Sequence, residues 1–278
     1  PGETILSDKL DYFCGGKGLN QSIALAKAGA NIFHAGSIGH DGLILKETLE
    51  KYNVNTDYVN ISDEHTGHAI IQVDSKGQNC IILYGGANQT ITPDYVDSVL
   101  SHFDEGDIIL LQNEISSIPY IIDKAFSKKI KIAFNPSPFK KELLEYNLQN
   151  ISWFLINEIE GNEITGETEP EKICTAMLNR YPNAAIVLTL GSKGVMYRDK
   201  HECAVHGVYD VPIVDTTAAG DTFTGYFLAS VTQGMNVNDA LKHASIASAL
   251  AITVKGAANS IPYAQDVEKS YDVLIPRF

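Results

Sequence analysis

The chain has 278 residues, 44% of them hydrophobic and 20% charged, which fits one large α/β domain or two smaller ones. Its 34 acidic residues outnumber 21 basic ones, and the net charge is −13 with only three arginines. With so few basic residues, the chain has no basic surface that could neutralise a nucleic-acid backbone, so we expect no nucleic-acid partner. No apolar run approaches the roughly 18 residues that cross a bilayer, so we expect neither a membrane partner nor a signal peptide.

Four cysteines are scattered along the chain at positions 14, 80, 174 and 203, and none forms a CxxC pair. This pattern argues against a zinc ribbon or a disulfide scaffold and is typical of a reducing compartment. We therefore expect a cytoplasmic protein.

The first predicted helix follows two glycines in "FCGGKGLNQSIALAKAG", residues 13–29. Exposed backbone beside Lys17 and Asn20 suits a polyhydroxylated ligand, which needs fixed donors and acceptors at close range. The alternative is a plain helix start with a solvent-exposed lysine. "YGGAN" at residues 84–88 repeats the pattern, and Asn88 is a further candidate donor.

Residues 67–86 read as two strands joined by a turn at residues 74–77. With the opening residues they could form a small sheet that acts as a lid, or remain a plain edge hairpin. His65 and His68 beside them form an HxxH pair without a suitably spaced third ligand, so we interpret them as surface or lid histidines.

Downstream, short apolar runs alternate with a helical pattern, as at residues 118–129. The runs are continuously apolar, which is typical of strands covered on both faces, and they predict a doubly wound, mainly parallel α/β sheet. The predicted strands are Asp107–Glu114, Ile130–Pro138, Trp153–Glu160 and Ala184–Gly194. We expect a core of residues 15–66 and 87–278, and a lid of residues 1–14 and 67–86.

Polar residues follow each predicted strand, and the carboxyl ends of such strands are where ligands bind. Glu114 is placed there to accept hydrogen bonds from sugar hydroxyls. Asn157 and Glu160 follow another strand, where a carboxylate can hold Mg²⁺ through water. Either residue could instead cap a helix.

The stretch "VDTTAAGDTFTG", residues 214–225, places Asp221 where an apolar helix begins. Unpaired backbone N–H groups of Ala219, Gly220 and Asp221 would form an anion site at this helix start. They could hold a phosphoryl group in flight while the carboxylate accepts the proton of an attacking hydroxyl. The plainer interpretation of Asp221 is a helix cap.

A second turn, "TLGSKG" at residues 189–194, offers main-chain donors to nucleotide phosphates. It is not a Walker loop, because the GxxxxGK[ST] spacing is absent. The GxGxxG dinucleotide fingerprint is also absent, which disfavours an NAD-dependent enzyme.

Together these segments resemble the PfkB-type carbohydrate kinase family, and within it the bacterial ribokinases. The resemblance runs from residues 1–5 to residues 260–262 and implies a ribokinase-like fold with helices on both sheet faces and a small β-sheet lid. Its motifs, in chain order, are "GGKGLNQS", "GGAN", "LQNE", "NPSP", "NEIEGNEITG", "TLGSKG", "VDTTAAGDTFTG" and "KGAANSIP".

The resemblance implies catalytic, substrate, nucleotide and metal residues. The implied catalytic residues are the base Asp221 and the anion hole of Ala218, Ala219 and Gly220. The implied sugar contacts are Gly15, Gly16, Lys17, Asn20, Glu114 and Asp221. The implied ATP contacts are Asn157, Thr189, Gly191, Ser192, Lys193, Gly194, Gly220 and Ser245. Glu160 would support Mg²⁺ through water, and the implied K⁺ ligands are Asp215, Thr217, Ala251, Val254, Gly256 and Ser260. The resemblance also implies a homodimer formed through the lid.

The chain departs from the family pattern at Leu19, Thr224 and Ser245, which affects substrate choice and nucleotide fit. We also expect the family's first core strand, which brings an Asn/Asp pair to the sugar, to be missing before Pro1.

We expect transfer of the ATP γ-phosphoryl group to a sugar hydroxyl, with D-ribose O5 as the leading acceptor. Fructose, a ketodeoxy sugar acid or a nucleoside are alternative acceptors. A non-catalytic sugar-binding protein on the same scaffold is a further alternative, but pure binding needs no base at Asp221.

Overall fold

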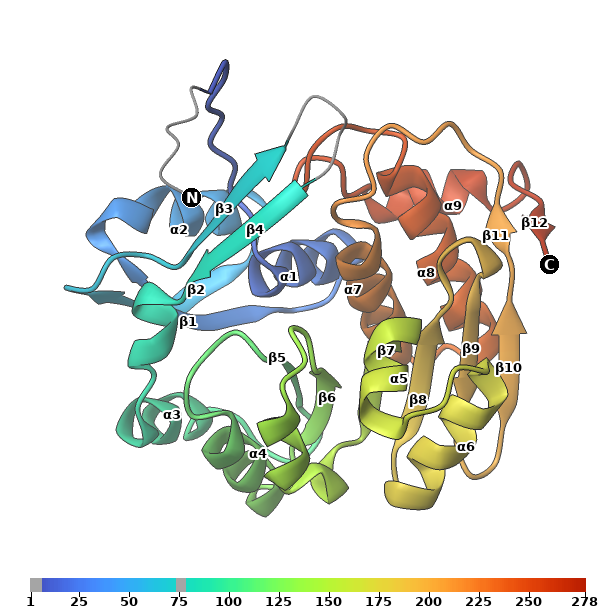
Figure 1. Ribbon diagram of the computed structural model, residues 1–278, viewed down its shortest axis with the longest axis horizontal. Helices are drawn as coiled ribbons and strands as arrows, with labels where there is room; N and C mark the ends of the chain where they lie inside the picture. The colour runs from blue at the N-terminus through green and yellow to red at the C-terminus, as the bar shows by residue number, and fades with distance from the viewer. Residues whose placement is uncertain (1–6, 74–78) are drawn as a thin grey trace, which may run out of the picture.

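We describe the protein from a computed structural model in which residues 7–73 and 79–278 are placed (Figure 1). The predicted turn at residues 74–77 and the first six residues of the predicted lid lie outside this described part. Within it, no helix is both long and apolar enough to cross a membrane.

A six-stranded sheet forms the centre of the molecule, in the order β10-β9-β8-β7-β6-β5. The strands β5 to β8 are parallel, and β9 and β10 form an antiparallel extension. The prediction of a mainly parallel sheet is confirmed, although all four predicted strands are shorter than predicted. The bounds are β5 Ile108–Gln112, β6 Lys131–Asn135, β7 Trp153–Asn157, β8 Ala185–Thr189, β9 Val195–Arg198 and β10 Cys203–His206.

Successive residues of the central strands enter different cores, because side chains alternate across a sheet. Phe154 and Ile156 join one core, which also contains residues of the helices on that face, whereas Leu155 joins the other. The continuous apolar runs in the sequence are thus explained by burial on both faces. The helices of the first core are α3 Pro93–Leu100, α4 Ile118–Ser127, α5 Glu158–Thr165 and α6 Pro170–Arg180. Those of the second are mainly α1 Lys17–Lys27, α7 Ala219–Thr232 and α8 Val237–Ala251, with one buried residue each from α2 Leu43–Lys51 and α9 Ala264–Ser270.

Helices α1 and α7 pack closely at Gly225, which is buried. A Cβ atom at Gly225 would overlap the side chain of Ala24 and lie 2.9 Å from the backbone nitrogen of Leu25. This close approach joins two helices that lie about 200 residues apart in the sequence. It brings their N-terminal turns together, where the predicted site residues lie.

Two further strands, β1 (Phe33–Gly39) and β2 (Asn55–Ser62), form a separate parallel pair. Strand β5 is the edge of the central sheet on that side. A cavity of about 2480 Å³ separates β1 from β5, and residues of both strands line it. The prediction that one core strand is missing stays a prediction, although this gap is where such a strand would fit.

The lid is a two-stranded antiparallel sheet of β3 (His68–Val73) and β4 (Asn79–Tyr84), which crosses in front of α1 in Figure 1. Its strands are as the sequence predicts. Residues 7–14 belong to no strand, so the described part of the opening segment does not extend this sheet.

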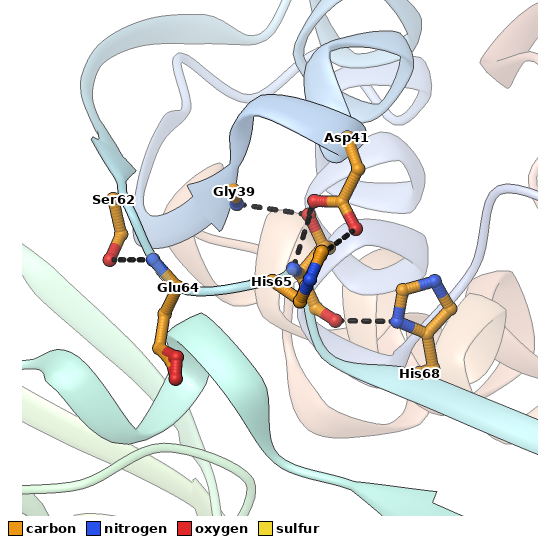
Figure 2. A network of polar contacts seen from close by, with 7 residues as sticks. Gly39, Asp41, Ser62, Glu64, His65 and His68 are labelled. Atoms are coloured by element: carbon orange, nitrogen blue, oxygen red, sulfur yellow. Dashed lines mark hydrogen bonds and ion pairs between the residues drawn. The ribbon is translucent and has the colours of Figure 1, made fainter.

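The hinge between β2 and β3 is held by a polar network around Asp41 (Figure 2). Thr66 donates to Asp41 Oδ1 from its hydroxyl (2.7 Å) and from its backbone nitrogen (3.0 Å). His65 Nδ1 lies 3.3 Å from Asp41 Oδ2, and His68 Nδ1 contacts the Thr66 carbonyl. His65 therefore takes part in fastening this connection to the core, whereas the His68 contact is local to the connection. The remaining strands are β11 Val208–Tyr209 and β12 Pro276–Arg277.

Candidate active site

The N-terminal turn of α7 is open to ligands. In the described part of the chain, no hydrogen-bond partner is found for the backbone N–H groups of Gly220 and Asp221, and Gly220 is exposed. The N–H of Ala219 donates to the carbonyl of Thr216 at 3.2 Å, so the prediction that it is unpaired is wrong. The chain tightens into a turn before the helix and uses that donor. Two free donors remain at the positive end of a helix dipole.

Asp221 is 9% exposed, and its carboxylate faces helix α1 rather than its own backbone. Asn20 Nδ2 donates to Oδ2 and Gln21 Nε2 donates to Oδ1, each at 2.9 Å. Burial raises the pKa of Asp221, while the hydrogen bond from Asn20, the charge of Lys17 and the hydrogen bond from Gln21 oppose that rise. The carboxylate does not cap α7, whose N-cap residue Ala218 makes no side-chain cap bond, so the plainer interpretation is excluded.

Lys17 lies within electrostatic reach of two carboxylates, those of Asp221 and Glu114. Burial raises the pKa of Glu114, the charge and backbone N–H of Lys17 lower it, and the nearby Asp221 raises it. Positions 17, 114 and 221 are far apart in the sequence, and the fold gathers them into one charge cluster. A cation between two acids can neutralise charge that builds up during phosphoryl transfer.

A small pocket of about 160 Å³ joins this cluster to the sheet edge. It brings together the predicted catalytic turn and part of the predicted nucleotide site, which come from α1, α7 and the carboxyl ends of β6, β7 and β8. Its predicted members are Lys17, Asn157, Glu160, Thr189, Thr217, Gly220 and Asp221.

The large cavity beneath the lid contains most of the predicted sugar residues. They lie around the start of α1 and the end of β5, and they are Gly15, Gly16, Asn20, Asn88 and Glu114. The lid residues Ile70 and Ile71 line the same cavity. The Oδ1 atom of Asn20 is buried without a hydrogen-bond partner in the described part of the structure, which leaves an acceptor for a ligand hydroxyl.

Asn157 and Glu160 form a capping box at the start of α5. Asn157 Oδ1 accepts from the backbone of Glu160 at 2.9 Å, and Glu160 Oε2 accepts from the backbone of Asn157 at 3.0 Å. Both residues therefore cap α5, as the alternative interpretation expects, and both also line the small pocket. The second carboxylate oxygen of Glu160 makes no hydrogen bond within the described residues, so the donor set fits a water-mediated Mg²⁺ contact.

Other predicted nucleotide residues lie outside both pockets. Gly191–Lys193 form an exposed 3₁₀ turn after β8, which ends at the half-buried Gly194, and Ser245 lies half-buried on α8. Neither lines the two pockets described here. Lys193 Nζ lies 3.7 Å from Glu158, which ties the exposed turn to the start of α5.

The predicted K⁺ ligands come from two segments that a carboxylate joins. Asp215 Oδ2 accepts from the backbone of Gly256 at 2.9 Å, and Asp215 Oδ1 accepts from the backbone of Thr217 at 3.0 Å. The hydrogen bond from the Thr217 hydroxyl, followed by those from the backbone of Gly256 and Thr217, lowers the pKa of Asp215. An ionised carboxylate is a hard oxygen donor of the kind that suits a cation such as K⁺. Ser260 is buried but Val254 is exposed.

Gln21 and Gln112 are polar contacts near Asp221 that the sequence analysis missed. Gln112 Nε2 donates to Gln21 Oε1 at 2.6 Å, and Gln21 in turn holds Asp221. Gln21 follows the predicted contact Asn20 directly, and Gln112 lies two residues before Glu114. Their adjacency to two predicted contacts was the only available signal.

The fold and this site define a class of protein. The chain matches the family described as pfkB family carbohydrate kinase over residues 1–264, and it belongs to that family. It is therefore a phosphotransferase that acts on a sugar hydroxyl, and the predicted family, fold and enzyme class are confirmed.

Ribokinases are among the similar proteins within this family. The ribokinase of Haemophilus influenzae is 32% identical over 275 residues, which cover 96% of this chain and 90% of the relative. The ribokinase of Bacillus subtilis is 31% identical with similar coverage. A solved structure of Arabidopsis thaliana ribokinase complexed with ribose and ATP has a TM-score of 0.85 at 31% identity, covering 98% of this chain and 91% of that chain.

Proposed function

We propose that the protein is an ATP-dependent ribokinase, which transfers the γ-phosphoryl group of ATP to O5 of D-ribose. One observation carries the proposal: the carboxylate of Asp221 and the free N–H of Gly220 line a single pocket with Asn157 and Thr189. A base, an anion site and a nucleotide-facing sheet edge then meet at one point. Relatives named ribokinase support the choice of ribose.

In the proposed reaction Asp221 accepts the proton of the sugar hydroxyl as the hydroxyl oxygen attacks the γ-phosphorus. The new O–P bond forms as the bond from the γ-phosphorus to the bridging oxygen breaks, and ADP leaves with that electron pair. The N–H groups of Gly220 and Asp221, with Ala218 and Ala219 shaping the turn, stabilise the charge on the transferring group.

Sugar binding is assigned to the large cavity. Glu114 accepts hydrogen bonds from sugar hydroxyls, Asn20 offers its unpaired Oδ1, and the glycines at 15 and 16 allow the ligand to approach the backbone. Lys17 neutralises charge between this cavity and the small pocket.

Nucleotide binding is assigned to the sheet edge, through Asn157 and Thr189, with residues 191–194 and Ser245 contacting the remainder of ATP. Bound Mg²⁺ would supply charge neutralisation on the phosphates, with Glu160 holding one of its waters. A K⁺ ion would be held by Asp215, Thr217 and carbonyl or hydroxyl oxygens of Ala251, Val254, Gly256 and Ser260.

The exposed apolar side chains of the lid support a homodimer, and the four free cysteines support a reducing, cytoplasmic setting. Ile81 and Ile82 of β4 are each about half exposed, and neither lines the large cavity. A second copy would cover these apolar side chains. Light scattering is expected to report a dimer, and Ile81→Asp is expected to shift the mass toward the monomer; a monomeric parent chain contradicts this assignment.

The cavity between β1 and β5 has room for one further parallel strand between them. Both are edge strands, and residues of both line the cavity.

The function is tested by measuring ADP release with a panel of acceptors: ribose, fructose, a ketodeoxy sugar acid and a nucleoside. The proposal predicts the highest kcat/KM for ribose. Turnover of the nucleoside without turnover of ribose would refute it, and sugar binding without any ADP release would favour the non-catalytic alternative.

A further inference from the structure

Asp221 is held on both carboxylate oxygens by neighbouring residues of α1. The two contacts differ in their surroundings. Asn20 lines the large cavity, and its Oδ1 has no partner among the described residues, so this atom can accept a hydrogen bond from a bound sugar. Gln21 is 2% exposed, and among the two pockets it lines only the small one. Gln21 itself is therefore not among the residues that line the sugar cavity, although Gln112, which contacts it, is one of them.

The orientation of the Gln21 amide is set by a third residue. Gln112, the last residue of β5, donates from Nε2 to Oε1 of Gln21 at 2.6 Å. An amide oxygen that accepts from Gln112 leaves the NH₂ group of Gln21 directed at Asp221. The relay thus runs from the edge of the central sheet through α1 to the start of α7.

We propose that Gln21 is a positioning residue for the reaction, which aims the Asp221 carboxylate, and that Gln112 fixes the direction of Gln21. This inference rests on the proposed role of Asp221 as the base. Hydrogen bonds to the charged form of a carboxylate favour that form, and a buried base needs them to stay ionised. Gln21 then keeps Asp221 competent to accept a proton in a site that burial would otherwise make unfavourable for charge.

The relay is not needed to join the two helices. Helices α1 and α7 already pack through apolar side chains and through the close approach at Gly225. At the other end of the same helix pair, Gln233 Nε2 donates to the carbonyl of Ala28 at 3.0 Å. This second glutamine makes the same kind of interhelical contact far along the helices from Asp221, and it provides a matched control.

The test compares Gln21→Met, Gln112→Met and Gln233→Met by steady-state kinetics and by the pH profile of kcat with ribose and ATP. Methionine keeps the length of glutamine and removes its donors. Gln21→Met is expected to lower kcat about tenfold or more, with both KM values within about twofold. In the pH profile of Gln21→Met, the acid limb, where kcat falls as the pH is lowered, is expected at higher pH. The reason is that Asp221 loses a hydrogen-bond donor that stabilises the ionised form of its carboxylate.

Gln112→Met is expected to change kcat and the acid limb in the same directions by smaller amounts, and Gln233→Met is expected to change neither. A folded Gln21→Met enzyme with the parent kcat and acid limb overturns the inference. If Gln21→Met does not fold, Gln112→Met decides, and an unmoved acid limb in that variant overturns it.

Asp221→Asn separates this inference from the proposed function. Loss of turnover in Asp221→Asn together with parent behaviour in Gln21→Met would refute only the positioning role. Retained turnover in Asp221→Asn would refute the assignment of the base, and the positioning role with it.

Discussion

The two pockets on either side of the α1 helix start are built differently. The small pocket is formed by strand ends of the central sheet and by the first turns of α1 and α7, whose core residues are almost fully buried. The large cavity is lined in part by residues of the two-stranded lid, whose isoleucines are about half exposed. Rigid elements hold groups in reactive geometry, whereas a lid can open and close around a ligand. Under the proposed function, chemistry and the binding of the ATP phosphates belong to the rigid side, and sugar selection belongs to the lid side.

The largest effect is expected at Asp221, where the two sides meet. Asp221→Asn keeps the shape of the side chain and removes the base, so turnover is expected to fall roughly 10³-fold. Sugar binding, measured by calorimetry, is expected to persist because the cavity beneath the lid is unchanged. An Asp221→Asn protein that releases ADP at the parent rate would break the assignment.

The rigid side is tested at the α1–α7 junction. Gly225→Ala is expected to destabilise the protein by about 1–3 kcal/mol, because the added methyl group overlaps Ala24 in a packed interface. Urea unfolding measures this change. Ala24→Gly in the same chain is expected to restore part of the loss, and additive effects of the two substitutions would show that the close contact is not the cause.

The division between sugar and nucleotide sides predicts a split in Michaelis constants. Glu114→Gln is expected to raise the KM for ribose about tenfold and to leave that for ATP unchanged, since one charge-assisted hydrogen bond is weakened. Asn157→Ala is expected to do the reverse. Equal effects of both substitutions on the two substrates would mean that the pockets are not separate in function.

The smallest effect is expected at the lid hinge, and it depends on pH. The backbone and hydroxyl of Thr66 lower the pKa of Asp41 from 3.8 to about 2. A carboxylate with a depressed folded-state pKa contributes stability above its unfolded pKa, and that contribution is lost as the pH falls from about 4 to about 2. Amide hydrogen exchange near residues 62–68 is expected to show Asp41→Asn loosening the hinge at neutral pH, with a smaller difference from the parent at acidic pH. Equal protection of both proteins at neutral pH would contradict this role of Asp41.

Much of the fold was predictable because its signals are local. Continuous apolar runs predicted β5 to β8, of which β6 to β8 are largely buried on both faces, and the predicted turn at residues 74–77 marked the two strands β3 and β4 on either side of it. The link between Gln21 and Asp221 was not predictable, because the two residues lie 200 positions apart and no local pattern encodes their contact. The use of the Ala219 N–H by Thr216 depends on the turn geometry before α7, which the small residues there leave open. The capping box at Asn157 could be foreseen as an alternative because its spacing is local.

The most direct measurement is a crystal structure of the protein with ribose, ADP, Mg²⁺ and a fluoride mimic of the transferring phosphoryl group. The account predicts the attacking sugar oxygen within about 2.6–3.2 Å of the Asp221 carboxylate, and the mimic on the N–H of Gly220. A sugar bound away from Asp221, or a nucleotide whose phosphates do not reach the start of α7, would contradict it.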